Sequence, residues 1–199
     1  MKKAVLIVSH EGSGSRALCE ILNRNARVQF THPNLVYNHP EVVESLTNHA
    51  HKLSNSAAVW LDEVLHNFYF SHKVIYKMCK FIYLVREPKP TLNMIVDMKL
   101  NSDCMTRYYC YRLRRICEMA RSTPGSVFLT WDDIYTGRAF PLLEKFLGLK
   151  EPLILDHAAF PLPKTNPFVT TSMVETCQNA YERYLYYLKN LPHLRRFEF

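Results

Sequence analysis

Four short runs of apolar residues divide the chain, and they constrain its fold more than any other feature. They are Ala4–Val8, Ala57–Leu61, Phe81–Val85 and Val127–Leu129. The runs are nearly continuous and do not alternate with polar residues, which is the pattern of strands covered on both faces. We therefore expect buried strands of a parallel sheet.

Helical patterns follow or separate these runs. One is marked by Leu18, Ile21, Leu22 and Asn25, a second covers Met105–Ala120, and a third starts at Ser172 with Glu175 in a capping-box pattern. The third has an apolar stripe of Val174, Cys177, Tyr181, Tyr184 and Leu188. Strands that alternate with helices predict a three-layer α/β fold, with a mainly parallel central sheet flanked by helices. Ligands of such sheets bind beyond the carboxyl ends of the strands.

The composition suits one globular domain over residues 1–199. Of these residues 48% are hydrophobic and 22% charged, which excludes a disordered, collagen-like or coiled-coil chain. No apolar run approaches the roughly 18 residues of a membrane span. The five apolar residues after Met1-Lys2-Lys3 are too few for a secretion signal, so we expect a cytoplasmic protein without a membrane span.

Charge and cysteine content narrow the partners only a little. The net charge of +7 allows a nucleotide, a sulfated or phosphorylated small molecule, nucleic acid or a membrane surface, and does not choose among them. The six cysteines include no Cys-x-x-Cys pair, so we expect no zinc site, disulfide framework or other metal.

The loop after the first run is rich in glycine and serine and leads directly into a helix. Glycines let a backbone approach a ligand, and the free N–H groups at a helix start favour an anion. We expect a phosphate or sulfate to be held by Gly12, Ser13, Gly14, Ser15 and Arg16. The alternative is a tight turn in which Ser13 or Ser15 caps the helix. Because no lysine follows Gly14, the Walker A pattern is not met, which argues against an ATPase or kinase.

Two further stretches repeat the plan of strand, polar end and helix. One strand ends in Arg86-Glu87-Pro88; the next leads into Trp131-Asp132-Asp133-Ile134, followed later by Phe146-Leu147-Gly148. With Ser13-Gly14-Ser15-Arg16, these stretches resemble, in order and spacing over most of the chain, the sulfotransferase family that uses 3′-phosphoadenosine-5′-phosphosulfate (PAPS). The run Ser15–Leu18 is similar to the Thr-Arg-Ala-Leu of its heparan sulfate branch.

The resemblance implies a P-loop-like sulfotransferase fold and a donor site. The first loop would grip the 5′-phosphosulfate of PAPS and Arg86 its 3′-phosphate, with 3′-phosphoadenosine-5′-phosphate (PAP) as product. Arg16 could stabilise charge at the leaving phosphate, and so could Lys164, if the proline-rich segment around it folds over the site. The acceptor would be an unidentified small molecule, glycan or peptide, and no nucleic acid partner is expected.

Two positions depart from the family pattern. Gly12 stands where the family has Lys or Arg, and Met94, eight residues after Arg86, stands where it has serine. Losing a comparable charge-stabilising group lowers rates by about 10²–10³. Asn93 or Lys89 could replace the serine as a phosphate ligand. The chain thus resembles a divergent member, in which a lysine engineered at position 12 should raise donor affinity or turnover.

Sulfuryl transfer also needs a base for the acceptor proton. Asp62, Glu63 and His66 follow the second run, so they should lie at the same sheet edge as the loop, which itself contains His10 and Glu11. Each has a plainer interpretation: Asp62 or Glu63 could cap the next helix, and His66 could be a surface residue.

The sequence leaves three functions open. The first is a sulfotransferase that moves a sulfuryl group from PAPS to a hydroxyl or amine acceptor. The second is a catalytically degenerate nucleotide- or anion-binding module on the same fold, favoured by Gly12 and Met94. The third, more distant, is a nucleotide or small-molecule kinase.

Overall fold

The computed structural model describes residues 4–24, 28–31, 57–62, 79–95, 102–160 and 165–195. Three of the predicted site residues, Glu63, His66 and Lys164, lie outside these described residues. Their roles stay predictions.

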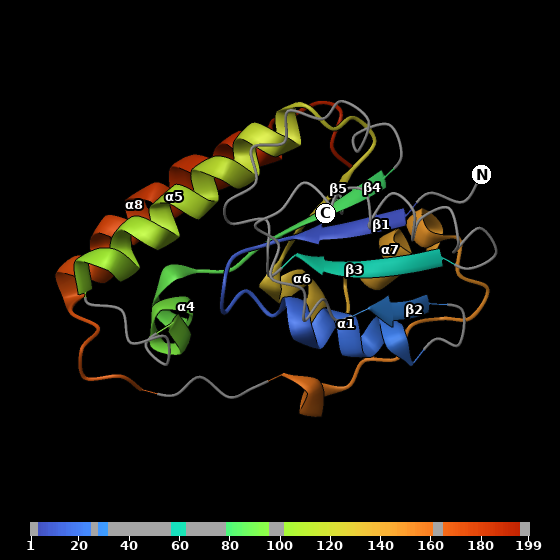
Figure 1. Ribbon diagram of the computed structural model, residues 1–199, viewed down its shortest axis with the longest axis horizontal. Coiled ribbons are helices and arrows are strands. Elements are labelled where there is room, and N and C mark those ends of the chain that lie inside the picture. The colour runs from blue at the N-terminus through green and yellow to red at the C-terminus, as the bar shows by residue number, and fades with distance from the viewer. Residues whose placement is uncertain are drawn as a thin grey trace.

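In the described part of the chain, five strands form one parallel sheet (Figure 1). They are β1 (Ala4–Val8), β2 (Val28–Thr31), β3 (Ala57–Asp62), β4 (Cys79–Val85) and β5 (Val127–Thr130). Their order is β2-β3-β1-β4-β5, and every neighbouring pair is parallel. This confirms the predicted sheet. β2 was not predicted, because its sequence Val-Gln-Phe-Thr is short and alternates apolar with polar residues.

Helices cover both faces of the sheet (Figure 1). They are α1 (Ser15–Asn23), α4 (Pro88–Ile95), α5 (Ser102–Arg121), α6 (Trp131–Tyr135), α7 (Phe140–Leu147), α8 (Thr171–Lys189) and the short 3₁₀ helix η2 (His157–Ala159). The long helices α5 and α8 pack side by side on one face, while α1 and α7 lie on the other.

Strand β4 shows how the two faces are filled. Phe81, Tyr83 and Val85 belong to a hydrophobic core shared with α5 and α8. Ile82 and Leu84, which alternate with them, belong to a second core shared with α1, α6 and α7. All five side chains are at most 1% exposed, because successive residues of a strand point to opposite faces and both faces are covered. The expected three layers are therefore present.

The predicted start of α8 is wrong, and α1 lacks the serine cap of the alternative interpretation of its loop. Helix α8 begins at Thr171, and the side chain of Thr170, not of Ser172, accepts the hydrogen bond from the Met173 N–H at 3.3 Å. Neither serine caps α1: the capping residue is Gly14, whose φ of 90° is left-handed and which offers no side chain to the helix. The backbone N–H groups at the start of α1 therefore receive no side-chain cap, which leaves this end suited to a ligand.

Candidate anion-binding site

The loop between β1 and α1 lies at the carboxyl edge of the sheet, as expected. Val8, the last residue of β1, pairs with Asp62 at the end of β3 on one side and with Tyr83 of β4 on the other. The backbone of Asp62 thus ends at the same edge as the loop. The loop is a tight turn, closed by a hydrogen bond of 3.1 Å from the Ser13 N–H to the His10 carbonyl.

Glycines shape this loop at two places. Gly12 and Gly14 have φ values of 72° and 90°, in the left-handed region that favours glycine. A Cβ on Gly14 would lie 2.6 Å from Cδ1 of Trp131, so the indole packs directly on the loop backbone. Between the glycines, Ser13 is fully buried and its hydroxyl has no hydrogen-bond partner. A buried hydroxyl without a partner is costly, which points to a missing polar ligand.

Arg86, the residue after β4, reaches into this loop. Its Nη1 donates to the Gly12 carbonyl and to the Met94 sulfur, both at 3.2 Å. Its guanidinium stacks on the Trp131 ring at 4.2 Å, and its Nε has no hydrogen-bond partner. The residue is only 4% exposed. Burial lowers the pKa of Arg86, while the Asp132 and Glu87 carboxylates partly offset this, so the group stays cationic.

The two departures from the family pattern touch each other. A Cβ on Gly12 would lie 3.2 Å from both the Met94 Cβ and the Thr91 carbonyl oxygen. Together with the left-handed φ, this leaves no relaxed place for a longer side chain at position 12. A lysine at position 12 would therefore first strain the loop and α4. The expectation that it restores donor binding stays a prediction.

His10 holds the loop rather than facing a substrate. Its Nε2 accepts the Arg86 backbone N–H at 3.0 Å, and its Nδ1 donates to the Glu11 carbonyl at 2.9 Å. Its ring meets Tyr109 edge-on at 5.1 Å. The pKa of His10 is lowered to about 4, mainly by burial and also by the positive charges of Arg112 and Arg86, while the hydrogen bond to the Glu11 carbonyl raises it. Since both nitrogens are used and the ring is neutral, we assign it no proton-transfer role.

The other predicted donor-site residues lie around the loop. Ser15 and Arg16 open α1, with Arg16 exposed and Ser15 partly buried. Glu11 is partly buried, and its backbone N–H donates to the Tyr108 hydroxyl at 3.0 Å. Asn93 instead connects two segments, because its Oδ1 accepts the Asn166 N–H at 3.2 Å.

Helix α5 supplies three contacts that sequence reasoning missed. Besides the Tyr108 contact with Glu11, the Tyr109 hydroxyl donates to the Arg86 carbonyl at 2.7 Å. Nη2 of Arg112 donates to the Ser9 carbonyl at 2.5 Å. The sequence predicted only a helical pattern here, over Met105–Ala120, and did not indicate that Arg112 is buried, at 1% exposed. The available signal was the i, i+3 and i, i+4 spacing of Arg112 from the two tyrosines.

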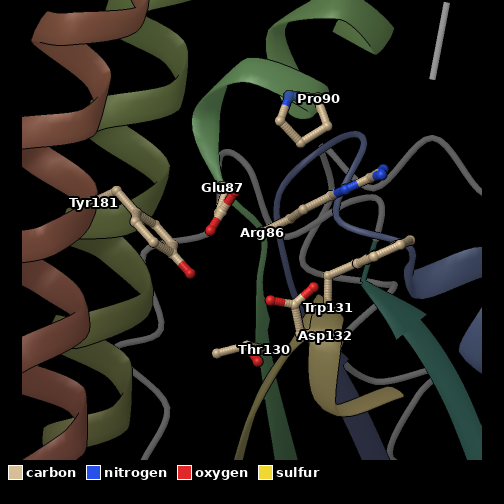
Figure 2. A pocket seen from close by; sticks show the side chains of 7 residues that line it. All are labelled: Arg86, Glu87, Pro90, Thr130, Trp131, Asp132 and Tyr181. Atoms are coloured by element: carbon tan, nitrogen blue, oxygen red, sulfur yellow. The ribbon is translucent and has the colours of Figure 1, made fainter. Parts of the chain in front are cut away.

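A pocket of about 70 Å³ opens beside Arg86, between the ends of β4 and β5 (Figure 2). Its walls are Arg86, Glu87, Pro90, Thr130, Trp131, Asp132 and Tyr181. Arg86 and Trp131 line the pocket and also contact the loop. Of the acidic pair after β5, only Asp132 therefore lines this space beside the loop. The other, Asp133, caps α6 through Thr130.

Comparison with solved structures shows the fold. The crystal structure of mouse sulfotransferase SULT7A1 complexed with PAP matches with a TM-score of 0.59 over 97% of this chain and 90% of that chain, at 15% identity. The fold is the sulfotransferase fold. No family model and no curated protein matches the sequence.

Among the described residues, no group of three or more His, Cys, Asp or Glu side chains could hold a metal ion. Within the same ranges, no helix has the length and apolar character to cross a bilayer.

Proposed function

We propose that the protein binds PAPS and transfers its sulfuryl group to a hydroxyl or amine acceptor. The observation that carries the proposal is the loop at the start of α1, where a buried serine hydroxyl and a buried arginine Nε lack partners. Both can donate a hydrogen bond to phosphate or sulfate oxygens. The similarity in fold to a sulfotransferase complexed with PAP supports PAPS over other anions.

The residues fit such a donor in distinct ways. PAPS, when bound, supplies the activated sulfuryl group. Ser13, Gly14 and Ser15 would offer the hydroxyls and backbone N–H groups at the start of α1, and Arg16 a charge at its first turn. The Arg86 guanidinium, which donates a hydrogen bond to the Gly12 carbonyl, would supply a second positive charge beside the loop. We propose Asp62, Glu63, His66 and Glu11 as candidates for the base, and Lys164 as a further cation.

A second candidate function is nucleotide binding without turnover. It is favoured by the contact between Gly12 and Met94, since a glycine and a thioether occupy both positions where the family has polar ligands. Under either function we propose a cytoplasmic protein with a small-molecule, glycan or peptide acceptor or partner.

Titration with PAP tests the shared step. At 100 times the dissociation constant, PAP should raise the free energy of unfolding by about 2.7 kcal/mol. Folded protein whose melting temperature does not respond to PAP would refute both functions. If PAP binds, transfer of radiolabelled sulfate from PAPS to a broad set of acceptors then separates the sulfotransferase from the binding module.

A further inference from the structure

The pocket beside Arg86 presents hydrogen-bond acceptors, although an anion site was expected there. Figure 2 shows the Glu87 and Asp132 carboxylates and the Tyr181 hydroxyl turned towards the same space, while the Arg86 guanidinium points away from it. That guanidinium is committed to Gly12 and Met94. In the described part of the chain, neither carboxylate makes a hydrogen bond or an ion pair.

Tyr181 adds a third polar group without a described partner to the pocket. It is 7% exposed, and its hydroxyl points into the pocket without a hydrogen bond from any described residue. Burial raises its pKa, and the negative charges of Glu87, Asp132 and Asp133 raise it further, so the hydroxyl stays neutral. The side chain is mostly buried, while its hydroxyl oxygen stays open to the pocket, so a ligand bound in the pocket can reach it.

The chemistry of the pocket fits a protonated amine. An ammonium group has three N–H donors and no acceptor, and the pocket offers two carboxylates and a phenol oxygen. The Tyr181 ring in its wall adds a surface that attracts cations, whereas the Trp131 ring is already stacked on Arg86 and Tyr135. Its volume of about 70 Å³ exceeds the ~10–15 Å³ that a cavity needs to hold one water molecule, and it admits an amino group on a short stem. A phosphate there would instead face two carboxylates.

We propose that the pocket formed by Glu87, Asp132 and Tyr181 binds the protonated amino group of a small amine, so that the acceptor of the proposed transfer carries such a group. The acceptor role rests on the proposed function, whereas amine binding does not. The amino group is held for recognition, and the pocket shares Arg86 and Trp131 with the donor loop.

Calorimetric titration with 2-phenylethylamine at pH 7.5, without PAP, tests the proposal. The neutral analogue 2-phenylethanol should bind at least about tenfold more weakly, because it lacks the charge. Glu87→Gln and Asp132→Asn should each weaken amine binding by about tenfold, and Tyr181→Phe by less. The control Glu175→Gln removes an exposed carboxylate of α8 that does not line the pocket and should leave the affinity unchanged. Melting curves confirm that each variant folds.

Three results would overturn the proposal. The first is equal affinity for the amine and the alcohol, and the second is amine affinity unchanged in both carboxylate variants. The third is binding of MgCl₂ that these variants abolish, which would make the pocket an inorganic cation site. PAP titration of the variants separates the two proposals. Loss of PAP affinity in Glu87→Gln would show that the pocket belongs to the PAPS site. If the protein binds the amine and does not bind PAP, the amine site stands and the proposed sulfotransferase function is refuted.

Discussion

The hydroxyl of Ser13 offers a test in which stability and binding change in different directions. It is buried without a partner, so Ser13→Ala removes an unsatisfied group and should leave the free energy of unfolding unchanged or raise it by up to about 1 kcal/mol. The same change should weaken PAP binding by roughly tenfold, because a hydrogen bond to a charged oxygen is lost. Chemical denaturation and calorimetry measure the two quantities, with the exposed Ser172→Ala as control. Unchanged PAP affinity would remove Ser13 from the site.

Gly12 allows the cost of close packing to be separated from the cost of backbone strain. Gly125 has a similar φ, 76° against 72°, but a Cβ there meets nothing within 4 Å. Gly125→Ala should therefore lower the free energy of unfolding by about 1 kcal/mol, which is the cost of a left-handed φ for alanine. Gly12→Ala adds contacts of 3.2 Å with Thr91 and Met94, so we expect it to lose about 1 kcal/mol more. If urea denaturation gives the same loss of unfolding free energy for both variants, α4 can shift at no cost to make room for a side chain at position 12.

At the scale of elements, α5 supports the loop between β1 and α1. Three of its side chains reach the backbone of Ser9, Glu11 and Arg86, which belong to two different strand ends. These contacts fix the distance between the β1 loop and the end of β4. The loop glycines alone would not fix it, since glycine is the most permissive residue for the backbone.

Removing one of these contacts tests the support role of α5. Tyr109→Phe leaves the Arg86 carbonyl without its donor, so the free energy of unfolding should fall by about 1 kcal/mol. For a chain of this length that lowers the melting temperature by about 2–4 °C. PAP affinity should also fall, because the Arg86 segment loses its anchor. Tyr186→Phe, at a side chain 73% exposed on α8, is the matched control. A lower melting temperature with unaltered PAP affinity would limit Tyr109 to a purely structural role.

At the scale of the molecule, the sequence predicted the sheet and its two helical layers better than the contacts between side chains. Apolar runs such as Phe81–Val85 report burial on both faces, and burial sets the sheet. Cap positions were harder, because Thr170 and Ser172 are both good N-caps and only the path of the chain chooses between them. Long-range contacts leave no local pattern: Arg86 binds the carbonyl of Gly12, and any residue at position 12 has that carbonyl.

The arrangement around His10 links the site to the stability of the whole chain. The pKa of His10 is about 4 in the folded chain against 6.5 ordinarily, so between these pH values the unfolded chain binds the extra proton. The free energy of unfolding is therefore fully retained above pH ~6.5 and should fall by roughly 3 kcal/mol as the pH drops to ~4. Urea denaturation across this range measures the slope, which His10→Gln should flatten and the exposed His157→Gln should not. If His10→Gln keeps the slope of the wild-type protein, other titrating groups cause the loss of stability in acid. A flattened slope would mean that protonation of His10 disrupts its hydrogen bond to the Arg86 N–H, which connects the loop after β1 to the end of β4. PAP binding should then weaken over the same pH range.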